Sequence, residues 1–205
     1  MTAEEHKFYS FTCKTSYSRP TPIVDWFLQT AENVIKLNAT NRDILTSNEK
    51  SFESVTNVLY ISFKRKSNGA EFFCKGSNDI GEVISSHKII LNVTYAPDGE
   101  PTIHALANGS TYKIIENVLG NLSCSISWGN PLPLLSWSCN GKSVPSIIEK
   151  QAVELNLQWE TKRDNDKICI CKSTHAIAGI QTAIVGISVL LKSGKAHSME
   201  TKSQT

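Results

Sequence analysis

The chain of 205 residues has six side chains suited to cross-linking or metal binding: Cys13, Cys74, Cys124, Cys139, Cys169 and Cys171. An even number of cysteines in a short chain favours disulfide bonds and an oxidising compartment. Zinc is the alternative, but one residue separates Cys169 from Cys171, whereas zinc motifs usually have two to four. His175, four residues after Cys171, keeps zinc binding open, and free structural thiols are a third possibility.

Four asparagines stand in the Asn-x-Ser/Thr pattern of N-glycosylation: Asn38, Asn92, Asn108 and Asn121. One such tripeptide arises easily by chance, but four beside six cysteines favour an extracellular or cell-surface protein. Alternation with neighbouring apolar residues places Asn92 and Asn121 on outward faces of strands, and the other two fall in loop segments. The first residues show no basic or apolar signal region, so we expect the export signal outside this stretch.

No catalytic or cofactor motif accompanies these residues. The chain has no Gly-x-Ser-x-Gly, no His-Glu-x-x-His and no glycine-rich phosphate loop. Lys64-Arg65-Lys66 is interpreted as a solvated turn, with a heparan-like contact as the alternative. The histidines are scattered and expected to be solvated: His6, His87, His104, His175 and His197. The sequence therefore predicts a protein that is not an enzyme and that has no cofactor or metal.

The charge balance excludes two further classes of partner. Lys and Arg number 21 and Asp and Glu number 19, a formal net charge of +2. This balance lacks the basic excess that nucleic-acid binding or attachment to a membrane surface requires. Residues 176–191 are mostly apolar, but 16 residues are fewer than the roughly 20 that a membrane-spanning helix needs. We expect a strand and its loop there, and no membrane span in this chain.

The elements that position these residues are predicted to be strands. The chain holds 20 Ile, 11 Val and 16 Thr, and β-branched side chains pack well on a pleated sheet. Short runs with period-2 alternation are separated by breaks rich in proline, such as Arg19–Pro22 and Asn130–Pro133. The pattern predicts an all-β fold built from sandwiches.

The sequence contains one unit twice. Trp26 follows Cys13 by 13 residues, and Trp137 follows Cys124 by the same interval. An alternating apolar run then precedes a second cysteine in each half, and another such run ends each half. Residues 95–101 contain two prolines and a glycine, which indicates a short linker. We therefore expect domains at residues 1–97 and 98–192, followed by a disordered tail at residues 193–205.

The repeated Cys…Trp…Cys pattern resembles the immunoglobulin superfamily over roughly residues 5–192. The cysteine separations of 61 and 47 residues resemble intermediate or constant-2 sets. Tandem copies joined by a Tyr-x-Pro linker are similar to cell-adhesion ectodomains such as the nephrin-like group. The resemblance implies two tandem immunoglobulin-like β-sandwiches, with a tryptophan packed on an inter-sheet disulfide in each. The implied disulfides are Cys13–Cys74 and Cys124–Cys171.

The sequence departs from the family pattern in three places. Phe72 stands where the family usually has the tyrosine that precedes the second cysteine, and Cys169 stands at that position in the second half. In the family's strand register Trp137 faces Cys171, and the same register places Cys139 opposite Cys169, which implies a third disulfide. Only 12 residues precede Cys13, so we expect a first domain truncated at its first strand.

Two aromatic residues are candidates for partner binding. Phe27 follows Trp26 and must point to the opposite face of its strand, a face that many family members use to bind one another. Trp128 lies between the cysteine strand and the tryptophan strand of the second half, outside the core pattern. A loop tryptophan can anchor a partner, although it can also pack under its own loop.

The resemblance implies a non-enzymatic extracellular protein that mediates cell adhesion or cell-surface recognition by binding a protein partner, either homophilic or heterophilic. The alternative is a secreted immune-type protein that recognises a microbial or soluble ligand. A third reading, an intracellular module of muscle-type repeats, would have reduced thiols and unused glycosylation sites. Because one fold serves many functions, the choice among them is an analogy at this stage.

Overall fold

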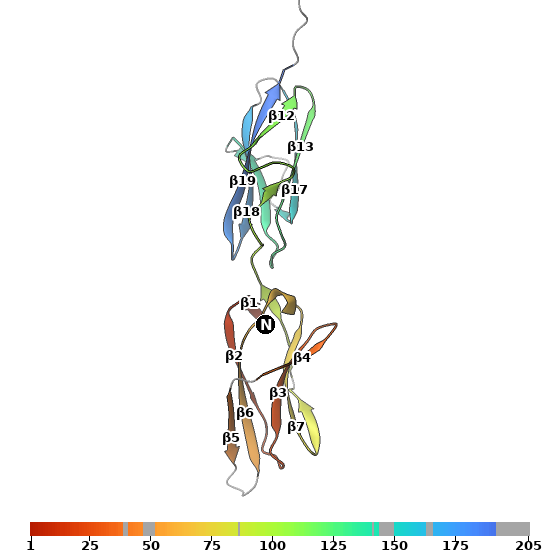
Figure 1. Cartoon of the computed structure of the whole chain (residues 1–205), viewed down its shortest axis with the longest axis vertical. Helices are drawn as coiled ribbons and strands as arrows, with labels where there is room; N and C mark the ends of the chain where they lie inside the picture. Colours follow the sequence, from red (N-terminus) through yellow and green to blue (C-terminus); the bar gives the residue numbers. More distant parts are fainter. Residues whose placement is uncertain are drawn as a thin grey trace, which may run out of the picture. The chain divides into compact units, whose positions relative to one another are not determined.

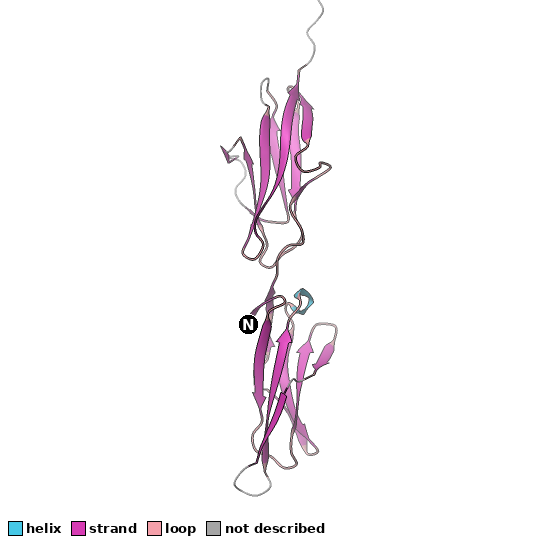
Figure 2. Ribbon diagram, turned by 60° about the vertical axis from the view of Figure 1, so that its left-hand side comes forward, coloured by secondary structure: helices cyan, strands magenta, loops and turns pink. Residues whose placement is uncertain are grey.

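The computed structural model describes residues 1–38, 41–46, 52–85, 87–140, 142–143, 150–162 and 166–191. Its internal contacts divide the chain into Met1–Tyr95 and Ala96–Thr205. Each unit consists of strands joined by short loops, and a single 3₁₀ turn, η1 (Arg65–Ser67), is the only helical element in the described ranges (Figures 1 and 2). The predicted all-β class is therefore confirmed. The predicted tail at residues 193–205 lies outside the described residues.

The first unit is a two-layer sandwich. One sheet has the order β2-β6-β5, and the other has the order β4-β3-β7-β8 with β9 also paired to β7. A short parallel pair, β1 with β10, completes the unit. The strands are β1 (Thr2–Glu4), β2 (Phe8–Lys14), β3 (Ile23–Gln29), β4 (Val34–Leu37), β5 (Asn41–Thr46), β6 (Glu53–Ser62), β7 (Glu71–Asn78), β8 (Gly81–Ile84), β9 (Ile89–Ile90) and β10 (Asn92–Thr94).

Aromatic rings fill the core between these sheets. Trp26 of β3 and Phe72 of β7 stack with centroids 5.2 Å apart, and Phe11 and Phe63 pack against Phe72 at 4.6 and 5.6 Å. The indole N–H of Trp26 donates to the buried Asn57 side chain at 3.0 Å. Phe72, which has no hydroxyl, is fully buried, so this position contributes apolar packing rather than a hydrogen bond.

The second unit repeats the two-layer plan. Its sheets have the orders β11-β13-β17 and β12-β19-β18-β14-β15, and β16 also pairs with β14. The apolar run at residues 176–191 forms a turn and most of the longest strand, and no helix in the described residues could cross a membrane. The strands are β11 (Thr102–Ile103), β12 (Thr111–Ile115), β13 (Leu119–Ser125), β14 (Leu134–Cys139), β15 (Lys142–Ser143), β16 (Lys150–Gln151), β17 (Glu154–Glu160), β18 (Lys167–His175) and β19 (Gly179–Leu190).

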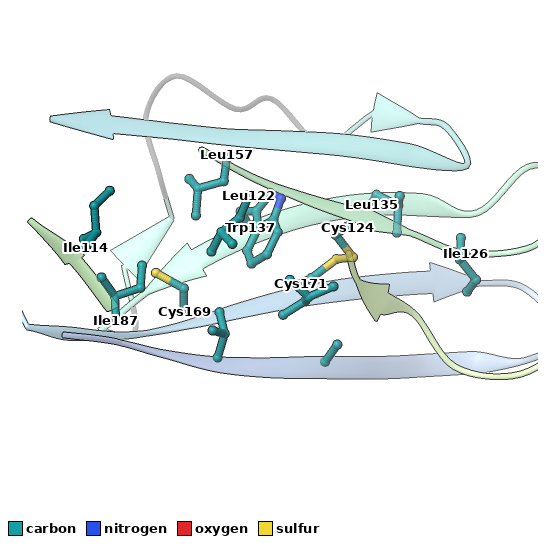
Figure 3. Close-up of a cluster of buried hydrophobic side chains, with 13 residues drawn as sticks. Ile114, Leu122, Cys124, Ile126, Leu135, Trp137, Leu157, Cys169, Cys171 and Ile187 are labelled. Atoms are coloured by element: carbon teal, nitrogen blue, oxygen red, sulfur yellow. A yellow bond between two sulfur atoms is a disulfide. The ribbon is translucent and has the colours of Figure 1, made fainter. Parts of the chain in front are cut away.

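Trp137 lies at the centre of the second core, beside the disulfide between Cys124 and Cys171 (Figure 3). Its indole N–H donates to the carbonyl of Leu155 at 3.1 Å. Both cysteines are fully buried, and Leu157 packs in the same cluster. The strand alternation recognised in the sequence thus directs one face of each strand into the core.

Candidate protein-binding surfaces

Three disulfides join the sheets and strands that carry the candidate surfaces. Cys13 bonds to Cys74 and Cys124 bonds to Cys171, each across its sandwich. The third disulfide joins Cys139 and Cys169, which face each other on the antiparallel strands β14 and β18. No described group of three or more His, Cys, Asp or Glu side chains could hold a metal ion. The six sulfurs therefore act as cross-links in this structure.

Phe27 lies on the outward face of β3, directly opposite Phe73 of β7. The two rings stack with centroids 5.6 Å apart, so Phe27 is half-buried and Phe73 is 8% exposed. The Lys88 ammonium lies 4.9 Å from the Phe73 ring centroid on the same face. Phe73 was not among the residues singled out from the sequence. The adjacent Phe72 and Phe73 were the available signal, because neighbours on a strand point to opposite faces.

Ion pairs of both signs surround this aromatic pair. Asp25 of β3 binds Lys36 of β4 at 2.7 Å, and Lys88 binds Glu71 of β7 at 2.7 Å. Lys75 of β7 pairs with Glu82 of β8. The charges therefore balance within the face. We call the outward side of β4-β3-β7-β8 the aromatic face.

Exposed aliphatic side chains extend the aromatic face toward its edges. The cross-strand register places these residues on the same side as Phe27 and Phe73. Their side chains are between 47 and 64% exposed: Ile23, Val34, Ile84 and Ile90. An apolar centre with polar pairs and further apolar groups around it is typical of a protein-binding surface.

Trp128 lies in the loop between β13 and β14 and is 65% exposed. The residues on either side of it are anchored within the second unit. The Ser127 hydroxyl donates to the Asp98 carbonyl at 2.9 Å, and Gly129 is buried so closely that an added Cβ would meet Pro97 at 2.9 Å. The loop is thus held at both sides while the indole projects into solvent.

The expectation that His175 is solvated is wrong, because the residue is only 5% exposed. Its Nδ1 accepts the backbone N–H groups of Ile177 and Ala178 at 3.1 and 3.3 Å. Nε2 therefore carries the hydrogen and donates to the Pro131 carbonyl at 2.9 Å. The ring stays buried because three backbone groups satisfy it, and it ties the turn after β18 to the loop that carries Trp128.

The expectation that Lys64, Arg65 and Lys66 form a solvated turn is wrong for Arg65. Lys64 and Lys66 are exposed, whereas Arg65 is half-buried. The Arg65 guanidinium binds the Glu5 carboxylate at 3.0 Å and lies 4.8 Å from the centroid of the Tyr95 ring. The side chain of Glu5 is 10% exposed. Hydrogen bonds from Arg65 hold the pKa of the Glu5 carboxyl below its ordinary value, against the opposing effect of burial. The η1 turn thus places Arg65 beside Glu5 and Tyr95, which are close to the first and last residues of the first unit.

All four candidate glycosylation asparagines are exposed: Asn38, Asn92, Asn108 and Asn121. Asn92 and Asn121 lie within β10 and β13, whereas Asn38 and Asn108 lie outside strands. The Asn108 side-chain oxygen accepts the N–H of Ile184 at 2.8 Å. Residues 39–40, which complete the first tripeptide, lie outside the described residues.

The comparisons with known proteins agree with this architecture. Residues 1–83 match the model of the CD80-like C2-set immunoglobulin domain. The mouse nectin-like molecule 4 ectodomain (Ig1–Ig3) matches 96% of this chain with 19% identity and a TM-score of 0.56, and the chain spans 64% of it. Rst D1-D2 matches 93% of this chain and 95% of its own length, with 14% identity and a TM-score of 0.62.

The eight N-terminal immunoglobulin domains of Down Syndrome Cell Adhesion Molecule match 94% of this chain at 15% identity, with a TM-score of 0.50. This chain spans 25% of that fragment. At such identities the structural likeness shows the fold, and immunoglobulin domains of this kind are typically non-enzymatic. Residues 1–83 thus match a C2-set immunoglobulin domain model, and the chain as a whole has the fold of solved tandem immunoglobulin-domain structures.

Proposed function

We propose that this chain is an extracellular or cell-surface recognition module that binds a protein partner through the aromatic face of its first domain. The stacked Phe27–Phe73 pair is the observation that carries the proposal. The pair lies on the outward side of the sheet, outside the core cluster around Trp26. Phe73 is itself buried and supports the half-buried Phe27 ring, which supplies contact area with little conformational entropy to lose on binding.

The charges of the aromatic face support a protein partner over other classes. Lys36, Lys75 and Lys88 each lie beside a carboxylate of the same domain, so the face has no excess of either sign. A nucleic acid would need a basic excess that this face lacks. A protein surface with its own mixture of charges and an apolar centre can match it, and a second copy of this chain is one such surface.

The extracellular part of the proposal is supported by the cross-links and the candidate sugar sites. Three structural disulfides are typical of a protein in an oxidising compartment and rare in the cytosol. The four asparagines of the acceptor tripeptides are exposed. We also propose Trp128 as a second contact, because its indole is exposed on a loop whose flanking residues are anchored.

The proposal is tested by presenting the chain at high density on fluorescent beads. Aggregation of beads that carry the same chain reports binding to a second copy, and adsorption to cells of the source organism reports a different surface partner. We expect one of these, and Phe27→Asp should abolish it, because a buried unpaired carboxylate costs several kcal/mol (~3 or more) at an interface centre.

The matched control is Ile44→Asp, which places the same charge at an exposed apolar position on the other sheet, where Ile44 of β5 is 49% exposed. This variant should bind as the parent chain does. Circular dichroism and thermal unfolding check that both variants are folded. The proposal is wrong if neither beads nor cells are bound, or if binding survives the change at Phe27 undiminished.

A further inference from the structure

The first domain presents a second pair of aromatic rings, on the sheet opposite the aromatic face. Phe8 of β2 and Tyr60 of β6 lie on neighbouring antiparallel strands (Figure 1). Tyr9 and Ile61, the next residues along these strands, pack against the core, so Phe8 and Tyr60 point outward. Their ring centroids are 6.2 Å apart, and the two residues are 66 and 59% exposed. Neither the core nor the aromatic face uses these rings.

The fold does not require aromatic residues at these two positions. In the second domain the same register positions hold Leu119 and Gln158. Leu119, like Phe8, stands five residues before the first cysteine of its domain. It is 63% exposed, although β11 and β12 precede its strand and pair with their sheets. Exposure at this position is therefore a property of the repeated unit, whereas the aromatic rings are particular to the first domain.

Hydroxyl groups surround the two rings. Ser62 lies opposite Phe8 in the strand register, and Ser10 lies opposite Tyr60. The next pair along the face adds Thr12 and the half-buried Val58. We call the outward surface formed by Phe8, Ser10, Tyr60 and Ser62 the aromatic platform. Its apolar area is limited to the two rings, and its rim can donate and accept hydrogen bonds.

Charged side chains lie away from the aromatic platform. On this face of the described strands they are Lys14 and Asp43, which share one register position at the far end of the sheet. Lys14 follows Phe8 by six residues of β2, about 20 Å of extended strand. Lys7, which precedes Phe8, pairs with Glu4 at 2.7 Å. The platform is thus aromatic and hydroxylated but uncharged.

This chemistry suits a neutral sugar better than a protein surface. A pyranose ring has a face of C–H groups that packs on the electron-rich face of an aromatic ring, and hydroxyls at its rim that bond to serine and threonine. Protein interfaces instead bury a contiguous apolar core inside a polar rim. Two rings on neighbouring strands give places for two adjacent sugar units.

The candidate glycosylation sites indicate where such a sugar comes from. Asn121 has the register position in the second domain that Ser10 has in the first, and it is exposed on the outward face. The inner part of an N-linked glycan consists of mannose and N-acetylglucosamine, which are uncharged. A sugar at any of the four acceptor asparagines therefore has the chemistry that the platform of another copy would bind.

We propose that the aromatic platform binds the neutral core of an N-linked glycan carried by another copy of this chain. One sugar ring stacks on Phe8 and the next on Tyr60, and the hydroxyls of Ser10 and Ser62 bond to the sugar rim. The platform lies on the sheet opposite the aromatic face, so this binding goes beyond the proposed function and does not depend on it.

The first experiment titrates the isotope-labelled core pentasaccharide of an N-glycan with the full chain and follows the sugar by NMR. Binding should be saturable and in the millimolar range, because an open two-ring site buries little of its ligand. The ring C–H protons should shift upfield, since they lie over aromatic rings. A sialylated form should bind no more tightly, although Lys64 is exposed in the turn after β6.

Two variants take the residues of the second domain and so are expected to fold. Phe8→Leu and Tyr60→Gln should each weaken pentasaccharide binding at least about tenfold and reduce the upfield shifts. Phe27→Leu makes the same change as Phe8→Leu on the aromatic face and should leave both unchanged. Thermal unfolding checks that all three variants are folded.

The second experiment tests the source of the sugar with beads that carry the Phe27→Asp chain, so that the aromatic face does not contribute. Chain made through a secretory pathway should aggregate the beads, and free pentasaccharide should disperse them. Enzymatic removal of the N-glycans, or the added change Phe8→Leu, should prevent aggregation. Failure of these changes to affect the beads would contradict the proposal.

Other outcomes would also overturn it. The platform is not a sugar site if the pentasaccharide causes no shift or binds Phe8→Leu equally well. Tighter binding of the sialylated form would assign it to anionic sugars. A secreted chain without N-glycans would exclude another copy as the source. Aggregation that survives glycan removal but is lost with Phe8→Leu would identify a contact between protein surfaces instead.

Discussion

At the residue scale, the packing of Trp159 depends on the glycine that faces it on the neighbouring strand. Trp159 of β17 lies opposite Gly120 of β13, and its ring lies over that glycine and 4.8 Å from the Lys167 ammonium. Tyr112 packs edge-on to the same ring at 6.2 Å. Burial lowers the pKa of Lys167, which agrees with its position against the indole. The missing side chain at Gly120 is therefore what allows Trp159 to pack on the core.

Gly120→Ala should destabilise the second domain, because the new Cβ would overlap the Trp159 ring. We expect a loss of about 1–3 kcal/mol in the free energy of unfolding, measured by urea titration of the full chain. Gly81→Ala is the matched control, since a Cβ there meets nothing within 4 Å, and it should change stability by less than about 0.5 kcal/mol. Equal effects of the two substitutions would contradict this explanation.

The lowered pKa of Glu5 predicts a pH-dependent contribution to the first domain. A carboxyl whose folded pKa lies below its unfolded value of about 4.3 stabilises the fold at pH 7. That contribution shrinks as the pH falls below the unfolded value, and it is lost once the pH passes below the folded value. Glu5→Gln should therefore lower the unfolding temperature at pH 7 and have much less effect near pH 3.

Differential scanning calorimetry of the full chain at the two pH values measures this difference. Glu32→Gln, at an exposed position in the loop between β3 and β4, is the control for loss of one negative charge. It should leave the unfolding temperature nearly unchanged at both pH values. A Glu5→Gln penalty of the same size at pH 3 as at pH 7 would show that packing, rather than the pairing with Arg65, explains the effect.

At the scale of elements, β18 takes part in two disulfides. Cys139 and Cys169 join β14 and β18 directly, and Cys171 of β18 also joins β13 of the opposite sheet. The first of these disulfides adds a constraint within one sheet, and the second adds a constraint between sheets. Both disulfides reduce the conformational freedom of the unfolded chain, which stabilises the folded domain.

Replacing Cys139 and Cys169 together by alanine should lower the free energy of unfolding of the second domain by about 2–4 kcal/mol. The domain should still fold, because the bridge between the sheets remains. Tryptophan fluorescence of the chain with Trp26 replaced by phenylalanine follows the unfolding of the second domain in urea, because the other three tryptophans all lie in that domain. The double valine variant restores most of the lost volume, so its remaining deficit measures the cross-link itself. Unchanged stability in both variants would show that this disulfide contributes nothing.

At the scale of the whole molecule, each domain has its own core and its own candidate surface. The core of the first domain is built around stacked aromatic rings, whereas that of the second is mainly aliphatic around Trp137 and two disulfides. The aromatic face lies on the first domain, and Trp128 lies on the second. The two domains therefore offer distinct candidate surfaces, and Phe27→Asp tests the one on the first domain by itself.

The repeated Cys…Trp…Cys spacing and the period-2 alternation were sufficient to predict two immunoglobulin-like sandwiches, because strand alternation and residue spacing are local properties. Alternation likewise indicated that Phe27 points away from Trp26. Only the tertiary structure decided that Phe73 completes the aromatic face, that His175 is buried and that Arg65 binds Glu5. These contacts join residues far apart in the sequence, so they depend on how the whole domain packs and not on the alternation within one strand.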